Sequence, residues 1–210
     1  GCTWRDGQLI HKNFATYLMP TSMDVPNIAS YHVDAYEASG PLGVKGAAEV
    51  STVSIAPAIN EAVRHGVNVF IYDWYWYDNR PFLENCLNDG FLKARNNTDM
   101  KFMLMWANHN ANHLWNIDLS DDFGQTVIWE GGVSMDIFKT LVDRWISKYM
   151  THPSYYKING CPVFMIYDVN NLISGLGGIE NTKEAISWFR DQTKEAGFPD
   201  LHLQITIWGE

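Results

Sequence analysis

Four short segments of the chain place acidic, amide or imidazole side chains beside aromatic ones. They are Asp73-Trp74-Tyr75-Trp76-Tyr77, Trp106-Ala107-Asn108-His109, Tyr167-Asp168 and Trp208-Gly209-Glu210. Amides, imidazoles and carboxylates hydrogen-bond hydroxyl groups, while flat rings pack on the apolar faces of a ligand. A saccharide has both kinds of surface, so the segments predict a carbohydrate site. The residues expected to bind the substrate are Trp74, Tyr75, Trp76, Trp106, Asn108, His109, Tyr167, Asp168 and Trp208.

Two acidic residues are the expected catalytic groups, because cleavage of a glycosidic bond commonly uses carboxyl groups on either side of the anomeric carbon. Asp73 and Glu210 each follow an apolar run of strand length. The alternative for Asp73 is a hydrogen bond to a neighbouring loop or to a sugar hydroxyl. The Val-Asn-Asn sequence after Asp168 favours a cap or turn role for that carboxylate. Glu130 lies in a loop segment that could reach the same site.

Other kinds of site have little support in the sequence. His109 and His113 have the spacing of a helical metal-binding pair, but the Asn-rich segment around them argues against a helix and no acidic third ligand accompanies them. No G-x-S-x-G, G-x-G-x-x-G or G-x-x-x-x-G-K-[ST] motif occurs, so a serine hydrolase elbow and a nucleotide-binding sheet are not indicated. We therefore expect neither a metal nor a cofactor.

The composition bounds the class of protein. The chain has 210 residues, a net charge of −9 and 14% aromatic residues, including nine Trp. A large aromatic core is one explanation for the rings, and a cleft lined with rings is the other. An acidic chain without a basic stripe repels phosphate backbones, so nucleic acid is not an expected partner. No apolar run reaches the length of a membrane span.

Apolar runs of strand length alternate with helical patterns along the chain. Strands are predicted at 14–19, 67–72, 101–106, 162–167 and 201–208, helices at 53–65, 81–96, 134–150 and 182–196, and a long loop at 21–52. Strands that are apolar throughout predict a parallel sheet covered by helices, the α/β class. Because the polar and aromatic clusters follow strands, where the mouth of a barrel lies, we predict a (β/α)8 TIM-type barrel. The chain would supply about the first five β/α units, as a single domain over residues 1–210 that is incomplete at its C-terminal end.

Three of these segments resemble the family-99-like glycoside hydrolase domains, also called WbsX-like. They are residues 66–77, 101–109 and 152–164, and the resemblance extends over roughly residues 50–208. It implies a (β/α)8 barrel that acts on mannose-type polysaccharides with retention, assisted by the sugar 2-hydroxyl rather than by a protein nucleophile. The chain departs from the family in two places. His109 stands where related domains commonly have Glu after Trp-Ala-Asn, and the motif Trp-Asn-Glu-Trp-x-Glu-Gly, which carries the paired glutamates, does not occur.

The expected function is therefore that of a retaining, endo-acting α-mannosidase-like glycoside hydrolase whose substrate is a polysaccharide or oligosaccharide. A glycosyltransferase of a polysaccharide cluster and a non-catalytic glycan-binding module are the alternatives. Cys2 has the position of a processed lipoprotein cysteine. It predicts a periplasmic or cell-surface protein that is lipid-anchored, although an incidental cysteine is equally compatible with the sequence.

Overall fold

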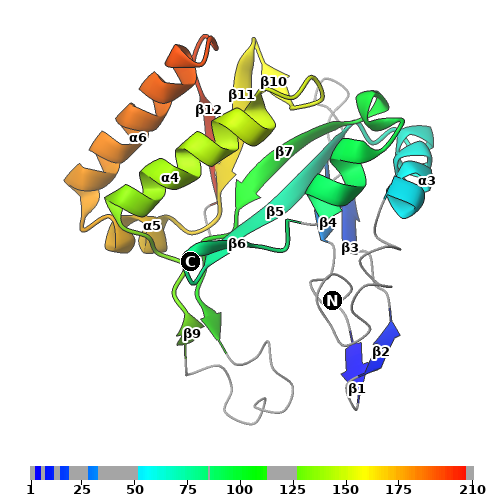
Figure 1. Ribbon diagram of the computed structural model, residues 1–210, viewed down its shortest axis with the longest axis horizontal. Coiled ribbons are helices and arrows are strands. Elements are labelled where there is room, and N and C mark those ends of the chain that lie inside the picture. Colours follow the sequence, from blue (N-terminus) through cyan, green and yellow to red (C-terminus); the bar gives the residue numbers. More distant parts are fainter. Residues whose placement is uncertain are drawn as a thin grey trace. The chain divides into compact units, whose positions relative to one another are not determined.

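The computed structural model describes residues 52–84, 86–112 and 127–206, together with the backbone of four strands before them (Figure 1). Side chains are described from Ile55 onward, except at positions 57 and 112. Four residues of the sequence predictions, Cys2, His113, Trp208 and Glu210, lie outside the described residues.

The described strands confirm the α/β class. The main sheet contains β3 (Ala15–Leu18), β4 (Ile28–His32), β5 (Val69–Tyr77), β7 (Lys101–Trp106), β11 (Cys161–Ile166) and β12 (His202–Ile205). The pairs β4–β5 and β11–β12 are parallel, whereas β3–β4 is antiparallel. The sheet is therefore mixed, and the prediction of a wholly parallel sheet is wrong. The predicted loop at 21–52 also contains β4, whose residues carry no continuous apolar run.

The order of the strands in the sheet bears on the choice between α/β architectures. Neighbouring strands run in the order β11, β7, β5, β4, with β12 paired to β11, so consecutive strands along the chain lie next to one another. An open, doubly wound sheet reverses its order at a switch point, whereas a barrel adds strands in sequence. This order favours the barrel, and the complete (β/α)8 barrel remains a prediction.

Most of the predicted helices are present. The described helices are α3 (Thr52–Arg64), α4 (Met135–Trp145) with its π-helical continuation η6 (Ile146–Met150), α5 (Val169–Gly175) and α6 (Ile179–Glu195). Three of them match the predictions at 53–65, 134–150 and 182–196. The short α5 was not predicted, but the cap role of Asp168 is confirmed, because its Oδ1 accepts a hydrogen bond from Asn171 N at 2.9 Å.

The predicted helix at 81–96 is wrong. The segment begins with β6 (Arg80–Phe82), which pairs antiparallel with β5, and continues through the short turns η1 (Cys86–Gly90) and η2 (Phe91–Lys93). Asp78 and Asn79 both have positive φ, 52° and 55°. Two such residues make the tight hairpin turn whose twist matches paired strands, and Asp and Asn adopt this conformation more readily than most residues. The hairpin therefore replaces the first turn of the predicted helix.

The chain forms two compact units. Unit 1 comprises residues 1–74 and 83–104, and unit 2 comprises residues 75–82 and 105–210. Unit 1 has a core of edge-to-face rings, Phe70, Tyr72, Phe91 and Phe102. The single domain over residues 1–210 stays a prediction.

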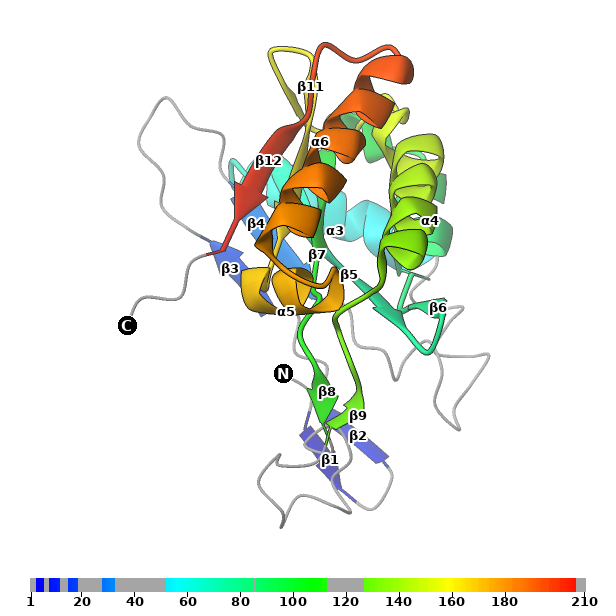
Figure 2. The ribbon, with the colours of Figure 1, turned by 90° about the vertical axis from the view of Figure 1, so that its left-hand side faces the viewer.

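In unit 2, α4 and α6 lie side by side over β11, as Figures 1 and 2 show. The contact between these layers is aromatic: Trp145 of α4 and Phe189 of α6 both pack on Phe164 of β11, at 4.4 and 5.4 Å between ring centroids. Burial of these large rings supplies the hydrophobic stabilisation of the layer. None of the described helices is both long enough and apolar enough to cross a membrane.

Candidate functional site

A continuous series of five aromatic rings lies in unit 2, and we call it the aromatic row. It consists of Trp129, Tyr77, Tyr75, His109 and Tyr167, in that order. The centroids of successive rings are 5.7, 6.0, 5.9 and 5.5 Å apart. The two tyrosines in the middle of the row, Tyr75 and Tyr77, are buried, whereas Trp129, His109 and Tyr167 are half-buried. The row therefore has two buried rings in its middle and three rings that are partly exposed to solvent.

Four separate segments bring the row together. Tyr75 and Tyr77 are two residues apart on β5, so their side chains leave the same face of the strand. Trp129 ends β9 (Val127–Trp129), which pairs antiparallel with β8 (Ala111–Asn112). His109 follows β7 and Tyr167 follows β11. The expectation that polar and aromatic residues after different strands come together is thus met for His109, Tyr167 and Tyr75.

A set of amide hydrogen bonds fixes the ends of β7 and β11, and we call Asn108, Asn110 and Asn171 the amide cluster. The Asn108 side chain, 1% exposed, donates through Nδ2 to Asp168 O at 2.7 Å and accepts from Asp168 N through Oδ1 at 2.8 Å. Asn171 Nδ2 donates to Asn108 O at 3.0 Å. Since the oxygen and the nitrogen of this buried amide are both bonded to the backbone of one residue, Asp168, the Asn108 side chain ties the segment after β7 to the segment after β11.

The segment after β9 is held against the same cluster at Gly131. Its N–H donates to Asn110 Oδ1 at 2.9 Å. A Cβ atom at this position would overlap the carbonyl oxygens of Asn108 and His109, so only glycine fits. The backbone on both sides of Glu130 is therefore fixed, by the Trp129 ring on one side and by Gly131 on the other. The Glu130 side chain itself is exposed.

His109 is held through both its ring and its backbone. Its Nδ1 lies 3.0 Å from the carbonyl oxygen of Asn110. Its own carbonyl oxygen accepts a hydrogen bond of 2.8 Å from the Tyr77 hydroxyl. Burial raises the pKa of the Tyr77 hydroxyl well above its ordinary value, which keeps it protonated and able to donate.

Four of the predicted binding residues are buried: Trp74, Tyr75, Trp106 and Asn108. Of these, Trp74 and Trp106 lie in the packing of their units and outside the aromatic row and the amide cluster. Trp74 is 2% exposed in unit 1, where its Nε1 donates to Oε1 of the buried Glu84 at 2.8 Å. Trp106 is fully buried in unit 2 and packs on Trp145 with 5.4 Å between centroids. Neither ring presents a face to a ligand in this structure. For these two residues, the alternative explanation of an aromatic core agrees with the observed burial.

The remaining predicted residues divide between the units. Asp73 and Trp76 are half-buried on β5, with Asp73 in unit 1 and Trp76 in unit 2. Trp208 and Glu210 lie outside the described residues. Sequence reasoning did not select Trp129 or Tyr77, although the Trp-Glu-Gly-Gly sequence at 129–132 and the Asp-Asn turn after Tyr77 were available signals.

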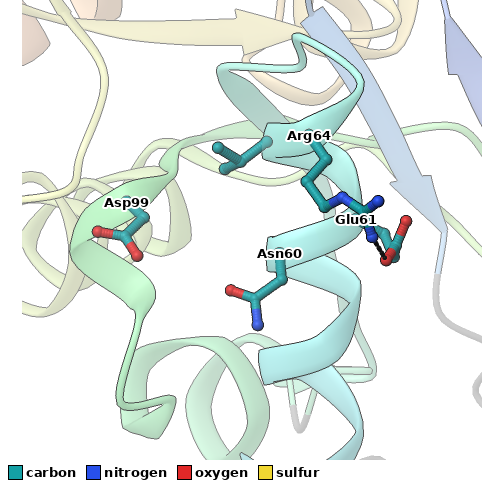
Figure 3. Close-up of a pocket in the computed structure, with 5 residues that line it drawn as sticks. Asn60, Glu61, Arg64 and Asp99 are labelled. Atoms are coloured by element: carbon teal, nitrogen blue, oxygen red, sulfur yellow. Dashed lines mark hydrogen bonds and ion pairs between the residues drawn. The ribbon is translucent and has the colours of Figure 1, made fainter.

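A hollow of about 490 Å³ opens on the other unit, beside α3 (Figure 3). It is lined by Asn60, Glu61, Val63, Arg64 and Asp99. Glu61 and Arg64 form an exposed ion pair of 2.8 Å, so Asp99 gives these lining residues a net charge of one negative unit. It contains no aromatic ring and none of the predicted site residues. The aromatic row is therefore the better candidate. Within the described ranges, no three His, Cys, Asp or Glu side chains lie close enough to hold a metal ion.

Comparisons with known proteins identify a family. The family model described as glycosyltransferase WbsX matches residues 53–208. The chain is also 35% identical over 68 residues to the 6-hydroxypseudooxynicotine dehydrogenase complex subunit gamma of Paenarthrobacter nicotinovorans. That alignment covers 30% of the chain and 9% of the curated protein, so it assigns neither fold nor activity. No solved structure matches the chain significantly. The family model spans the aromatic row and the amide cluster together, and the chain belongs to the WbsX glycosyltransferase family, a carbohydrate-active family.

Proposed function

We propose that this chain transfers a glycosyl unit to a hydroxyl group of a saccharide, with the aromatic row as the acceptor site. The description of the family supports transfer as the reaction class. The observation that carries the assignment to the aromatic row is the stack of Trp129 on Tyr77, with ring planes 21° apart, in the same row as His109. A half-buried indole backed by a second ring is a preorganised surface for a sugar face.

Polar groups beside the row suit the hydroxyl groups of a sugar. Asn110 is exposed, and its Oδ1 already orients Gly131 N, so its amide is fixed in place. Glu130 is exposed between two residues whose positions are fixed. An amide held in this way can recognise hydroxyls without ordering on binding, which lowers the entropic cost of recognition. The exposed Glu130 carboxylate can accept hydrogen bonds from the same hydroxyls.

A second candidate is hydrolysis of an α-mannosidic bond, in which water replaces the acceptor. It is favoured by the resemblance of residues 66–77, 101–109 and 152–164 to the family-99-like domains. In this reading Asp73 and Glu210 remain the proposed acids, and Trp76 and Trp208 remain proposed sugar contacts. An extracytoplasmic location with Cys2 as a lipid anchor is likewise a proposal.

Product analysis separates the candidates. The purified chain is incubated with a panel of sugar-nucleotide and glycosyl-phosphate donors and a labelled mannooligosaccharide, with and without donor. Extension of the oligosaccharide that requires the donor supports transfer. Donor-independent shortening supports hydrolysis, and binding without either product supports a glycan-binding module. If the oligosaccharide is neither bound nor changed, the assignment of the aromatic row to saccharides is wrong.

A further inference from the structure

We infer that His109 is the proton acceptor of this site and that it acts through Nε2. The inference rests on the proposed function, since it names the group that accepts a proton from the acceptor hydroxyl. Three observations carry the new role: the tautomer of the ring, the way in which the ring is held, and its partial exposure.

The tautomer follows from the contact with Asn110. A carbonyl oxygen only accepts hydrogen bonds, so the imidazole nitrogen that bonds to it must carry the hydrogen. At 3.0 Å from Asn110 O, that nitrogen is Nδ1. In a neutral imidazole with Nδ1–H, the lone pair is on Nε2, and Nε2 is the nitrogen that can take a proton. The backbone thus selects the tautomer.

The ring is also fixed in place before any ligand binds. Tyr75 and Tyr167 meet it edge to face, at 5.9 and 5.5 Å with interplanar angles of 85° and 66°. The backbone of His109 is held by the Tyr77 hydroxyl and by the close approach of Gly131 to its carbonyl oxygen. A general base contributes most when its geometry is set in advance, because little reorganisation then accompanies proton transfer.

The position of His109 in the row indicates what it serves. Trp129 and His109 are both half-buried and are separated by the two buried tyrosines, Tyr77 and Tyr75. A saccharide of more than one unit that stacks on Trp129 extends along the row toward the imidazole. The inferred substrate at this end is therefore the reacting hydroxyl of an oligosaccharide acceptor.

The inferred step is a substitution at the anomeric carbon of a glycosyl phosphate donor. The acceptor oxygen forms a bond to the anomeric carbon while its proton passes to His109 Nε2. The bond between the anomeric carbon and the phosphate oxygen breaks, and its electron pair leaves with the phosphate group. The imidazolium then releases the proton to solvent, which restores the neutral ring with Nδ1–H.

The first test measures the tautomer and needs no activity. Long-range 1H–15N correlation spectra of the whole chain are recorded near neutral and mildly alkaline pH, and the His109 signal is assigned by its loss in His109→Asn. The expected result is a protonated Nδ1 and a lone pair on Nε2. A ring protonated at Nε2 in its neutral form would overturn the inference.

The second test uses rates. Asn at position 109 can still donate to Asn110 O but has no basic nitrogen, so His109→Asn should lower kcat/KM by about 10²–10⁴-fold and abolish the acid limb of the pH profile. His202→Asn, on β12 and outside the row, is the matched control and should keep the wild-type kcat/KM and the acid limb of the pH profile. An active wild type whose His109→Asn variant keeps its rate within about threefold refutes this inference alone. A wild type without transfer or hydrolysis refutes the proposed function.

Discussion

Replacing Asn108 by Asp tests whether the amide cluster holds the site together. The Asn108 side chain makes two hydrogen bonds to the Asp168 backbone, one to its carbonyl oxygen at 2.7 Å and one from its N–H at 2.8 Å, and is 1% exposed. In Asn108→Asp the acceptor is kept, but an ionised carboxylate oxygen then faces the Asp168 carbonyl in place of the N–H donor. Loss of one hydrogen bond, worth about 1 kcal/mol, and a buried oxygen left without a donor, at about 1–3 kcal/mol, together predict a loss of about 3 kcal/mol.

The loss of stability in Asn108→Asp should be larger at high pH than at low pH. Burial and the facing carbonyl oxygen would raise the pKa of a carboxyl group at position 108 above its value in the unfolded chain. The folded state then binds the proton more tightly, so stability falls as pH rises from about 4 through the folded pKa. Below that folded pKa the protonated carboxyl donates to Asp168 O as the amide does, and much of the stability returns.

The assay is urea unfolding of wild type and variant at about pH 8 and about pH 5, with the free energy extrapolated to zero denaturant. The control is Asn170→Asp, the same substitution at an exposed position on α5, which should stay within about 0.5 kcal/mol of wild type. If Asn108→Asp matches Asn170→Asp at both pH values, the amide cluster does not hold the strand ends, and the argument built on it is wrong.

Three further predictions concern single residues. Gly131→Ala should lower the free energy of unfolding by about 3 kcal/mol, because the added Cβ would overlap backbone carbonyls. Gly197 has positive φ, +92°, but has open space around it, so Gly197→Ala should lower the free energy by only about 1 kcal/mol. Unfolding titrations measure both values. Burial raises the pKa of Tyr77, so this tyrosine ionises at lower pH in the unfolded chain than in the folded one, and stability falls above about pH 10. Unfolding midpoints measured across that range should fall less in Tyr77→Phe than in wild type. A hydrogen bond from the Leu201 backbone N–H lowers the pKa of Asp200, so the ionised Asp200 stabilises the fold above about pH 4. This stabilisation disappears as pH falls through the lowered pKa. In acid unfolding, the stabilities of wild type and Asp200→Asn should therefore converge below that pH.

Sequence patterns predicted the fold class and most helices because these depend on local periodicity. Residues 102–106 and 162–166 are apolar throughout and lie in β7 and β11, while Ser134 and Asp168 cap helices as their side-chain chemistry favours. The error at 81–96 has a local cause. Its helical spacing of apolar residues competes with the Asp78–Asn79 turn, and pairing of β6 with β5 satisfies the backbone there instead.

The candidate site was predicted in part. His109, Tyr75 and Tyr167 stood out because they follow apolar runs, and the structure brings them together. Trp129 lies on β9, which has three residues and pairs with the two-residue strand β8. Strands this short leave no pattern in the sequence, so nothing local connects Trp129 to Tyr77. Trp106 is the last residue of β7 and packs on Trp145 of α4, whereas His109 lies three residues beyond the end of the strand, a difference that the shared Trp-Ala-Asn-His segment does not reveal.

Titration calorimetry tests whether the aromatic row binds saccharides. Wild type, Trp129→Ala and Trp188→Ala are titrated with α-linked mannooligosaccharides and with a panel of other neutral hexose oligosaccharides. Trp188 is the matched control, a half-buried Trp on α6 whose ring lies 5.8 Å from Lys139 Nζ, outside the row. We expect the wild type and Trp188→Ala to bind and Trp129→Ala to lose at least about tenfold in affinity, equivalent to about 1.4 kcal/mol. If all three proteins bind equally, or the wild type does not bind, the aromatic row is not a saccharide site.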